Sequence, residues 1–217
     1  MKKLFLLLFS QCLIGLVFGQ DVYKITYHYF RDGAMLKQDP VVVYADKEKS
    51  FVTKQSILDS TARFSYEQSF LNNSTKSILR SATFSADDVA LMRDDKVWES
   101  YRLEPTAGSK KILNYETKKA VTSVNSNAIE LWYTEDLPIH ASPNDMGLNL
   151  GLVLEYRRNG NAGLVAAKIE KLKAWPSTII FPDTISLVDK LTYNDLLWKS
   201  RFIQVPIFTD EKVCFQP

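Results

Sequence analysis

Adjacent acidic residues are the groups in this chain that come nearest to hydrolytic chemistry, and three such pairs lie before residue 176: Asp87-Asp88, Asp94-Asp95 and Glu135-Asp136. A glycosidase needs two carboxyl groups that face each other across the bond to be cleaved. Neighbouring residues of a β-strand point to opposite faces of the sheet, so no adjacent pair supplies that arrangement. We interpret Asp94-Asp95 as the turn of a hairpin. Glu135, which follows a Trp-Tyr-Thr run, is a candidate for the rim of a binding site.

Nucleophiles and metal ligands have little support in the sequence. No serine stands in a Gly-x-Ser-x-Gly motif, which a nucleophilic hydrolase of the common type would need. His28 and His140 are not spaced as metal ligands, and Cys214 is far from both in the sequence. We therefore expect no catalytic residue, no metal and no cofactor in this chain.

Aromatic side chains offer a different kind of chemistry, because flat rings can bind a sugar ring or an acyl chain. The alternative is that they fill the core of a β domain. Trp132 and Tyr133 are consecutive in a segment that reads as a strand, so they should point to opposite faces of the sheet. We expect the one that faces away from the core to contact a ligand, with Glu135 beside it. The aromatic residues that we consider for ligand binding are Trp98, Tyr101, Trp132, Tyr133, Trp175 and Trp198.

The first 19 residues are typical of a signal peptide. Lys2 and Lys3 precede an apolar run over residues 4–18, and Gly19 is a small residue suited to cleavage. Cys12 follows Gln11 rather than a small residue, which disfavours a lipoprotein. We expect an exported chain, in the periplasm, in the cell envelope or secreted. No later segment is apolar for long enough to span a membrane.

The charge and cysteine content of the mature chain narrow the possible partners. Lys2 and Lys3 account for the whole formal net charge of +2, so the mature surface is neutral overall. A neutral surface argues against nucleic acid or an anionic membrane as a partner. Cys214 is the one cysteine left after cleavage, so the domain has no internal disulfide and depends on packing.

Alternation of apolar and polar residues predicts a mostly β domain over residues 20–175, followed by a C-terminal segment over 176–217. Residues 22–30 read as a half-buried strand, and residues 40–54 as a hairpin that turns between Asp46 and Lys49. Residues 56–80 are compatible with a strand or a helical turn. A second hairpin is expected around Asp94-Asp95, with a connecting loop over 105–109 and strands within 110–124 and 127–139. Thr192 is expected to cap a short helix, with Asp195 at its third position.

The stretch over residues 146–173 has three possible interpretations: a phosphate-binding loop, a membrane-seeking segment, or strands with special turns. A phosphate loop needs a helix after its glycines, whereas here the segment that follows reads as β. Gly147 and Gly151 are better explained by tight backbone geometry before a strand. Asn159-Gly160 supplies the two positive-φ residues of a type I′ hairpin turn, so residues 151–173 are expected to form two paired strands.

Several of these segments resemble the GLPGLI family of exported Bacteroidetes proteins. The resemblance lies in "ELWYTEDLPI" at 130–139, in the Gly147-Leu148 and 151–155 segments, and upstream in "ILNYETKKA" at 112–120. The sequence departs from the pattern at four positions, Asn114, Thr117, Asn149 and the extra Leu150. Since asparagine tolerates positive φ, a turn at Asn149 stays plausible.

Two segments are similar to the N-terminal bowl-like accessory domain of peptide N-glycosidase F relatives. They are the variant Gly-x-Asn-Leu-Gly-Leu-Val-Leu-Glu and the C-terminal "YNDLLWKSRFIQVPIFTDEKVCF". The resemblance implies a curved single antiparallel sheet or an incompletely closed barrel with a short C-terminal helix. It also implies that residues 203–217 connect to a missing catalytic domain. Three hypotheses follow: an accessory module for glycoprotein processing, a free-standing envelope protein that holds a peptide or apolar ligand, and, least favoured, an enzyme.

Overall fold

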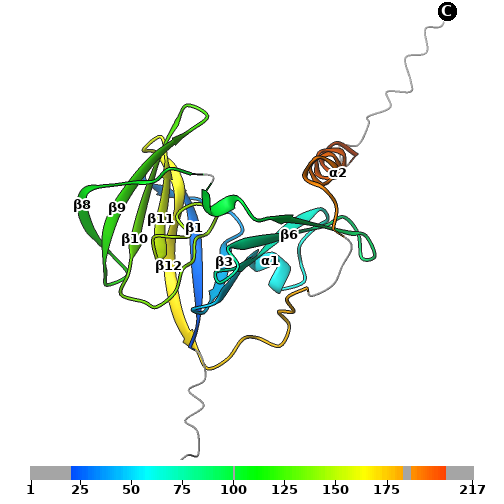
Figure 1. The fold of residues 1–217 in the computed structure, drawn as a ribbon, viewed down its shortest axis with the longest axis horizontal. Helices are drawn as coiled ribbons and strands as arrows, with labels where there is room; N and C mark the ends of the chain where they lie inside the picture. The colour runs from blue at the N-terminus through cyan, green and yellow to red at the C-terminus, as the bar shows by residue number, and fades with distance from the viewer. Residues whose placement is uncertain (1–20, 100, 183–186, 204–217) are drawn as a thin grey trace, which may run out of the picture.

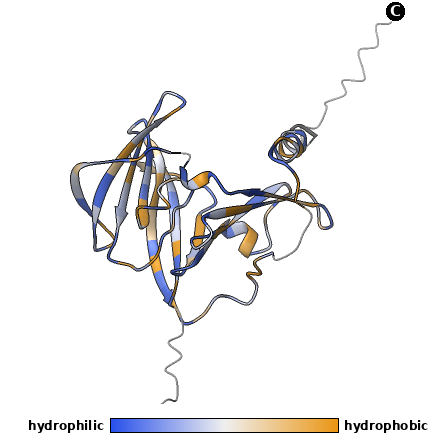
Figure 2. Ribbon diagram, viewed as in Figure 1, coloured by the Kyte–Doolittle hydropathy of each residue, from blue (hydrophilic) through white to orange (hydrophobic). Residues whose placement is uncertain are grey.

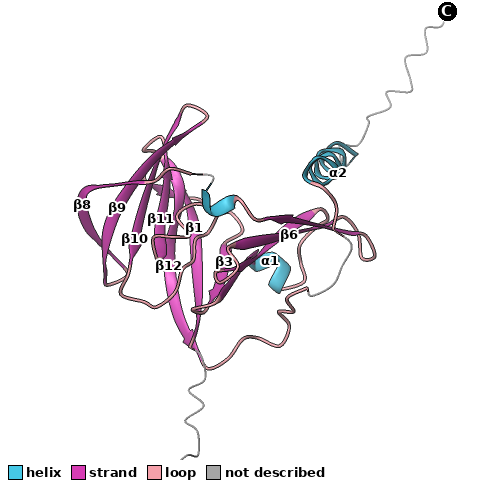
Figure 3. Ribbon diagram, in the orientation of Figure 1, coloured by secondary structure: helices cyan, strands magenta, loops and turns pink. Residues whose placement is uncertain are grey.

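The computed structural model describes residues 21–99, 101–182 and 187–203, and it consists mainly of one open antiparallel sheet (Figures 1 and 3). The order of strands across the sheet is β7-β6-β5-β4-β3-β1-β12-β11-β10-β9-β8, with β2 paired to the end of β1. The predicted fold class is therefore confirmed. The strands are β1 (Val22–Arg31), β2 (Ala34–Met35), β3 (Val41–Ala45), β4 (Lys49–Lys54), β5 (Tyr66–Asn72), β6 (Ser77–Thr83), β7 (Val89–Asp94), β8 (Glu104–Ile112), β9 (Tyr115–Val124), β10 (Asn127–Thr134), β11 (Leu152–Arg158) and β12 (Ala162–Leu172), and the helices are α1 (Gln55–Leu58), the 3₁₀ turn η1 (Val97–Glu99) and α2 (Lys190–Ile203).

The sheet bends strongly without closing. Figure 1 shows β8 to β12 curving together with β1 on one side, while β3 and β6 extend away from them on the other side. Register shifts between Thr26 and Tyr27 and between Trp132 and Tyr133 interrupt the ladders. Such irregularities bend a strand and increase its twist. β7 and β8 are the first and last strands in the order, so they form the two edges of the open sheet.

Alternation in β1 places its aromatic and apolar residues in the core, as predicted. Tyr23, Ile25 and Tyr27 are buried, whereas Lys24 and Thr26 are partly exposed, and Figure 2 shows hydrophobic and hydrophilic residues mixed along the strands in this way. The Tyr27 hydroxyl donates a hydrogen bond of 2.7 Å to the Val153 carbonyl oxygen, so its polar end is satisfied inside the core. Complete burial raises the pKa of Tyr27.

Two predicted hairpins are confirmed, and each turn has a clear local cause. The Asp46 carboxylate accepts hydrogen bonds from the amides of Glu48 (2.7 Å) and Lys49 (2.8 Å), which fixes the turn between β3 and β4. Between β11 and β12, Asn159 and Gly160 have φ values of 51° and 74°. These are the left-handed conformations for which the Asn-Gly pair is suited.

Gly147 and Gly151 hold the tight backbone geometry expected before β11. Gly151 has φ +117°, and a Cβ there would lie 2.6 Å from the Thr134 carbonyl oxygen. Gly147 has φ +79°, and a Cβ there would lie 2.8 Å from Leu131. Asn149 is not among the described residues with positive φ, so the left-handed conformation falls on the two glycines that flank it.

The hairpin predicted around Asp94-Asp95 is wrong, and so is the loop over 105–109. β7 pairs with β6, and after it the chain runs through η1 to the far edge of the sheet, where β8 pairs with β9. Asp94 accepts a 2.9 Å hydrogen bond from the Lys96 amide, so its turn chemistry closes a local bend instead of a hairpin. Residues 105–109 belong to β8, with a register shift at Gly108, whose φ is +144°.

After β12 the chain wraps around the edge strand β7. Trp175 donates a 2.6 Å hydrogen bond to Asp46, and Phe181 packs edge-to-face on Phe70 of β5. Leu187 then forms a parallel bridge with Leu91 of β7. This segment, residues 173–182 with 187–188, therefore covers one face of the outer strands and part of their edge.

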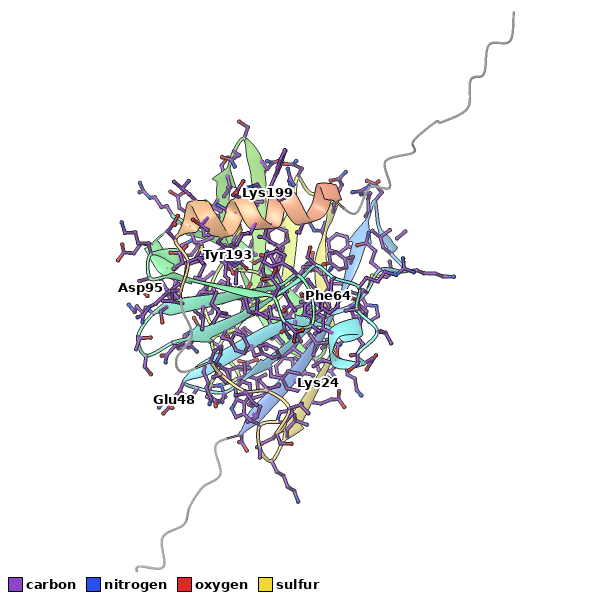
Figure 4. All side chains as sticks on the ribbon, turned by 90° about the vertical axis from the view of Figure 1, so that its right-hand side faces the viewer. Lys24, Glu48, Phe64, Asp95, Tyr193 and Lys199 are labelled. Atoms are coloured by element: carbon purple, nitrogen blue, oxygen red, sulfur yellow. The ribbon has the colours of Figure 1, made fainter. Side chains whose placement is uncertain are left out.

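Helix α2 then covers the opposite face of the outer strands. Its Tyr193 packs with Ala82, Ala90 and Met92, whose side chains alternate with those that face the wrapping segment. Figure 4 shows α2 lying across the strands, with Tyr193 between the helix and the sheet. The predicted signal peptide over 1–19, the predicted connector beyond residue 203 and Cys214 lie outside the described residues.

Asp189 caps α2, and the predicted cap at Thr192 is wrong. The Asp189 carboxylate accepts hydrogen bonds from the Leu191 amide (2.9 Å), the Thr192 amide (3.0 Å) and the Thr192 hydroxyl (2.6 Å). Thr192 thus lies inside the first turn, because the helix begins three residues earlier than its pattern indicated. The Thr192 hydroxyl and amides hold the pKa of Asp189 below its ordinary value.

Candidate functional site

Trp132, the predicted ligand contact, lies half-buried on β10 beneath two lysines. The Nζ atoms of Lys110 and Lys119 lie 4.2 and 5.5 Å from the centroid of the indole ring. Lys110 is held there by Glu155, at 2.6 Å, and a Cβ on Gly108 would lie 3.3 Å from the ring. The indole Nε1 is buried and has no hydrogen-bond partner. A ligand that stacks on this ring would have to displace Lys110 from it.

Tyr133 and Glu135 occupy very different surroundings. Tyr133 is 5% exposed and belongs to a buried cluster with Leu131 and Val153, whereas Trp132 packs against a different cluster. Glu135 is exposed and pairs with Lys118, and this hydrogen bond raises the pKa of Lys118. Of the two aromatic residues, Trp132 is therefore the one that is not buried in the core. Its contact with a ligand stays a prediction.

A hollow of about 400 Å³ lies between α2 and the strands β5 to β7, and we call it the α2 hollow. Its walls combine charged, amide, phenol and apolar side chains from both sides. The sheet contributes Glu67, Arg80, Met92 and Asp94, and the helix contributes Lys190, Tyr193, Asn194, Leu197 and Trp198.

Tyr193 is the residue that joins the helix to the sheet across this hollow. It is 1% exposed, and its hydroxyl donates a 3.1 Å hydrogen bond to Glu67. Burial, reinforced by the Glu67 carboxylate, raises the pKa of Tyr193. At the other end of α2, the hydroxyl oxygens of Ser65 and Ser200 lie 2.9 Å apart, within hydrogen-bond distance. The helix is thereby fixed to the sheet at two points.

Charges in the α2 hollow are balanced. Lys190 lies 3.6 Å from Asp94 on the sheet, and Arg80 forms an ion pair with Asp145 of the loop before β11. Trp198 lies on the helix side of the hollow with 62% of its surface exposed. The lining has two basic residues, Lys190 and Arg80, and two acidic ones, Glu67 and Asp94, so the hollow presents donors, acceptors and the Trp198 ring without a formal net charge.

In the part of the chain that the structure describes, neither histidine belongs to a group of side chains that could hold a metal ion. His28 is half-buried in β1, and His140 is exposed in the loop after β10. Among the described residues, no three His, Cys, Asp or Glu side chains form a group that could hold a metal ion. Within those same residues, no helix has the length and apolar character needed to cross a membrane.

The fold and the hollow define the class of this protein as an all-β domain built on one open, curved sheet with a helix across its outer strands. The chain belongs to the family described as "N-glycanase peptide, N-terminal domain", whose sequence model matches residues 25–195. That range runs from β1 into α2 and includes the sheet side of the α2 hollow together with Lys190, Tyr193 and Asn194, whereas Leu197 and Trp198 lie beyond it.

Two solved structures of PNGF-II are similar to this chain, each at 34% sequence identity. The structure in space group P2₁ has a TM-score of 0.78 over 83% of this chain, and the structure in space group C2 has a TM-score of 0.79 over 90%. The chain spans 34% and 36% of those PNGF-II chains. A comparison with curated protein sequences found no match. The broader resemblance to the GLPGLI family stays a prediction.

The α2 hollow was not predicted from the sequence. Glu67 and Arg80 fall in or at the end of the stretch that was compatible with either a strand or a helical turn. A signal was present in α2, where Tyr193 and Leu197 are spaced to share one helical face. That spacing indicates a packed helix, but it does not indicate which strands the helix covers.

Proposed function

We propose that this chain is the non-catalytic N-terminal module of a peptide N-glycosidase-like enzyme, and that it holds the glycoprotein substrate for a separate catalytic domain. Family membership across residues 25–195 is the observation that carries the proposal. The chain spans only about a third of PNGF-II, which supports a division of labour between this module and the rest of a longer protein. The activity of that longer protein would be cleavage of the amide that joins a glycan to asparagine.

Two acidic residues near Trp132, Glu135 and Glu155, are each held in ion pairs. Glu155 is bonded to Lys110 and Arg157, and Glu135 is paired with Lys118. Hydrolysis by two carboxyl groups requires an acid and a base that face each other across a cleft. Carboxylates held in ion pairs contribute to packing and to the charge balance of a surface instead.

We also propose that the protein is exported, as the basic and apolar pattern of residues 1–19 indicates. N-terminal sequencing of the protein recovered from outside the cytoplasm tests this step, and Gln20 is the expected first residue. A protein that retains Met1 in the cytoplasm would contradict it.

The experiment for the main proposal uses the full chain and an N-glycoprotein that carries accessible glycans. The mass of the glycoprotein after incubation measures glycan release, and surface plasmon resonance measures its binding. We expect binding without release. Glycan release by this chain would overturn the non-catalytic role, and absence of any binding would overturn the substrate-holding role.

A free-standing envelope protein with an apolar ligand is less well supported. The α2 hollow is lined by charged and amide side chains together with apolar ones. A lipid or acyl chain favours a pocket that is mainly apolar. A shift of tryptophan fluorescence on addition of a fatty acid, with no response to glycoprotein, would favour this alternative.

A further inference from the structure

We propose that the α2 hollow is a saccharide subsite, which takes one or two sugar residues of the N-linked glycan while the attached protein is held for processing. This inference rests on the proposed function, since it names the part of the substrate that the module recognises. It assigns a site to Trp198 and Asn194 of α2, Asp94 of β7 and Arg80 of β6, which meet only in the folded chain.

The charge balance of the hollow fits a neutral ligand. Its lining has two basic residues, Lys190 and Arg80, and two acidic ones, Glu67 and Asp94, so the formal charges cancel. A phosphate or a polyamine would gain little from such a site, because an ion is bound well where the opposite charge is in excess. A sugar carries hydroxyl groups that both donate and accept, so carboxylate, guanidinium and amide groups can all bond to it.

The aromatic wall fits the apolar face of a sugar ring. The Trp198 ring is on the helix side of the hollow and is 62% exposed, next to Leu197 and across from Met92. A sugar ring has C–H groups on one face, and it can pack on an indole ring while its hydroxyl groups reach the polar wall.

The hollow is held in shape before any ligand arrives. Asp189 caps the start of α2, buried Tyr193 fixes its middle to the strands, and Ser200 approaches Ser65 near its end. Fixing the wall in advance lowers the entropy cost of binding. The volume of about 400 Å³ lies within the range of small-molecule sites.

A peptide chain is less well suited to this position than a saccharide. An extended peptide commonly binds by adding a strand to an open sheet edge. Part of the nearby edge, at β7, is already used, because the Val188 amide donates a 2.8 Å hydrogen bond to the Leu91 carbonyl oxygen. The α2 hollow is instead lined by side chains. A sugar is recognised through hydrogen bonds and ring contacts with such side chains.

The test titrates the full chain with a free high-mannose N-glycan that retains its core N-acetylglucosamine residues, using isothermal titration calorimetry. Trp198→Ala and Asn194→Ala should each lower the affinity, by about tenfold or more for the tryptophan. Leu191→Ala is the matched control, since Leu191 is 82% exposed on the same helix but does not line the hollow. Circular dichroism confirms that each variant is folded.

The outcomes separate this inference from the proposed function. Equal binding of a glycoprotein before and after its glycans are removed would overturn the saccharide subsite, while the substrate-holding role would stand. Unchanged affinity for the free glycan in Trp198→Ala and Asn194→Ala would also overturn it. If the chain binds neither the free glycan nor the glycoprotein, both proposals fail.

Discussion

Replacement of Gly151 by alanine should destabilise the domain far more than replacement of Gly160 by alanine. Both glycines have positive φ, +117° at Gly151 and +74° at Gly160. A Cβ at Gly160 meets nothing within 4 Å, whereas at Gly151 it would lie 2.6 Å from the Thr134 carbonyl oxygen. The backbone of β10 or of the loop would therefore have to move to admit a single methyl group.

The expected cost follows from these two geometries. Left-handed backbone strain alone should cost about 1–2 kcal/mol in Gly160→Ala. In Gly151→Ala, backbone strain of about 1–3 kcal/mol adds to an overpacking cost of about 1–3 kcal/mol, for a total of about 2–6 kcal/mol. Such a loss is a large share of the roughly 5–15 kcal/mol that stabilises a typical domain.

Urea unfolding of the full chain, followed by tryptophan fluorescence, measures both free energies. The midpoint should fall for both variants and much further for Gly151→Ala, with similar slopes. If Gly151→Ala costs no more than Gly160→Ala, the close approach to Thr134 does not constrain the turn, and the reasoning is refuted.

Three further predictions concern α2 and β10. Hydrogen bonds from Thr192 lower the pKa of Asp189, so its carboxylate should stabilise the fold above its ordinary pKa of 3.8. This stability should be lost as the pH falls through the lowered value. Acid unfolding measures the loss, and Asp189→Asn should depend less on pH. Tyr193→Phe should cost about 1 kcal/mol in urea unfolding at neutral pH. Because the raised pKa of Tyr193 makes the wild type lose stability as the pH rises above 10, the difference from Tyr193→Phe should shrink there. A constant difference would contradict the raised pKa that burial and the Glu67 carboxylate produce. Trp132→Ala should weaken glycoprotein binding if this ring contacts ligand, and unchanged binding would remove it from the site.

The sequence by itself determined the features that depend on neighbours along the chain. The β1 alternation, the Asp46 turn and the Asn159-Gly160 turn each follow from a few adjacent residues, because side-chain period and turn conformation are local properties. The need for glycine at 147 and 151 could likewise be read from the stretch before β11. The pattern around Thr192 and Asp195 predicted a terminal helix, and the resemblance implied a curved, open sheet; the structure confirms both.

Only the tertiary structure decided which segments meet. Asp94-Asp95 has the composition of a hairpin turn, yet β7 and β8 become the two opposite edges of the sheet, since each already pairs with another strand. Likewise, Glu67 and Tyr193 are 126 residues apart in the chain, and their hydrogen bond exists only because α2 folds over the outer strands. Pairing between distant segments depends on the competition among all possible partners and on the entropy of closing long loops, and no short stretch of sequence contains that information.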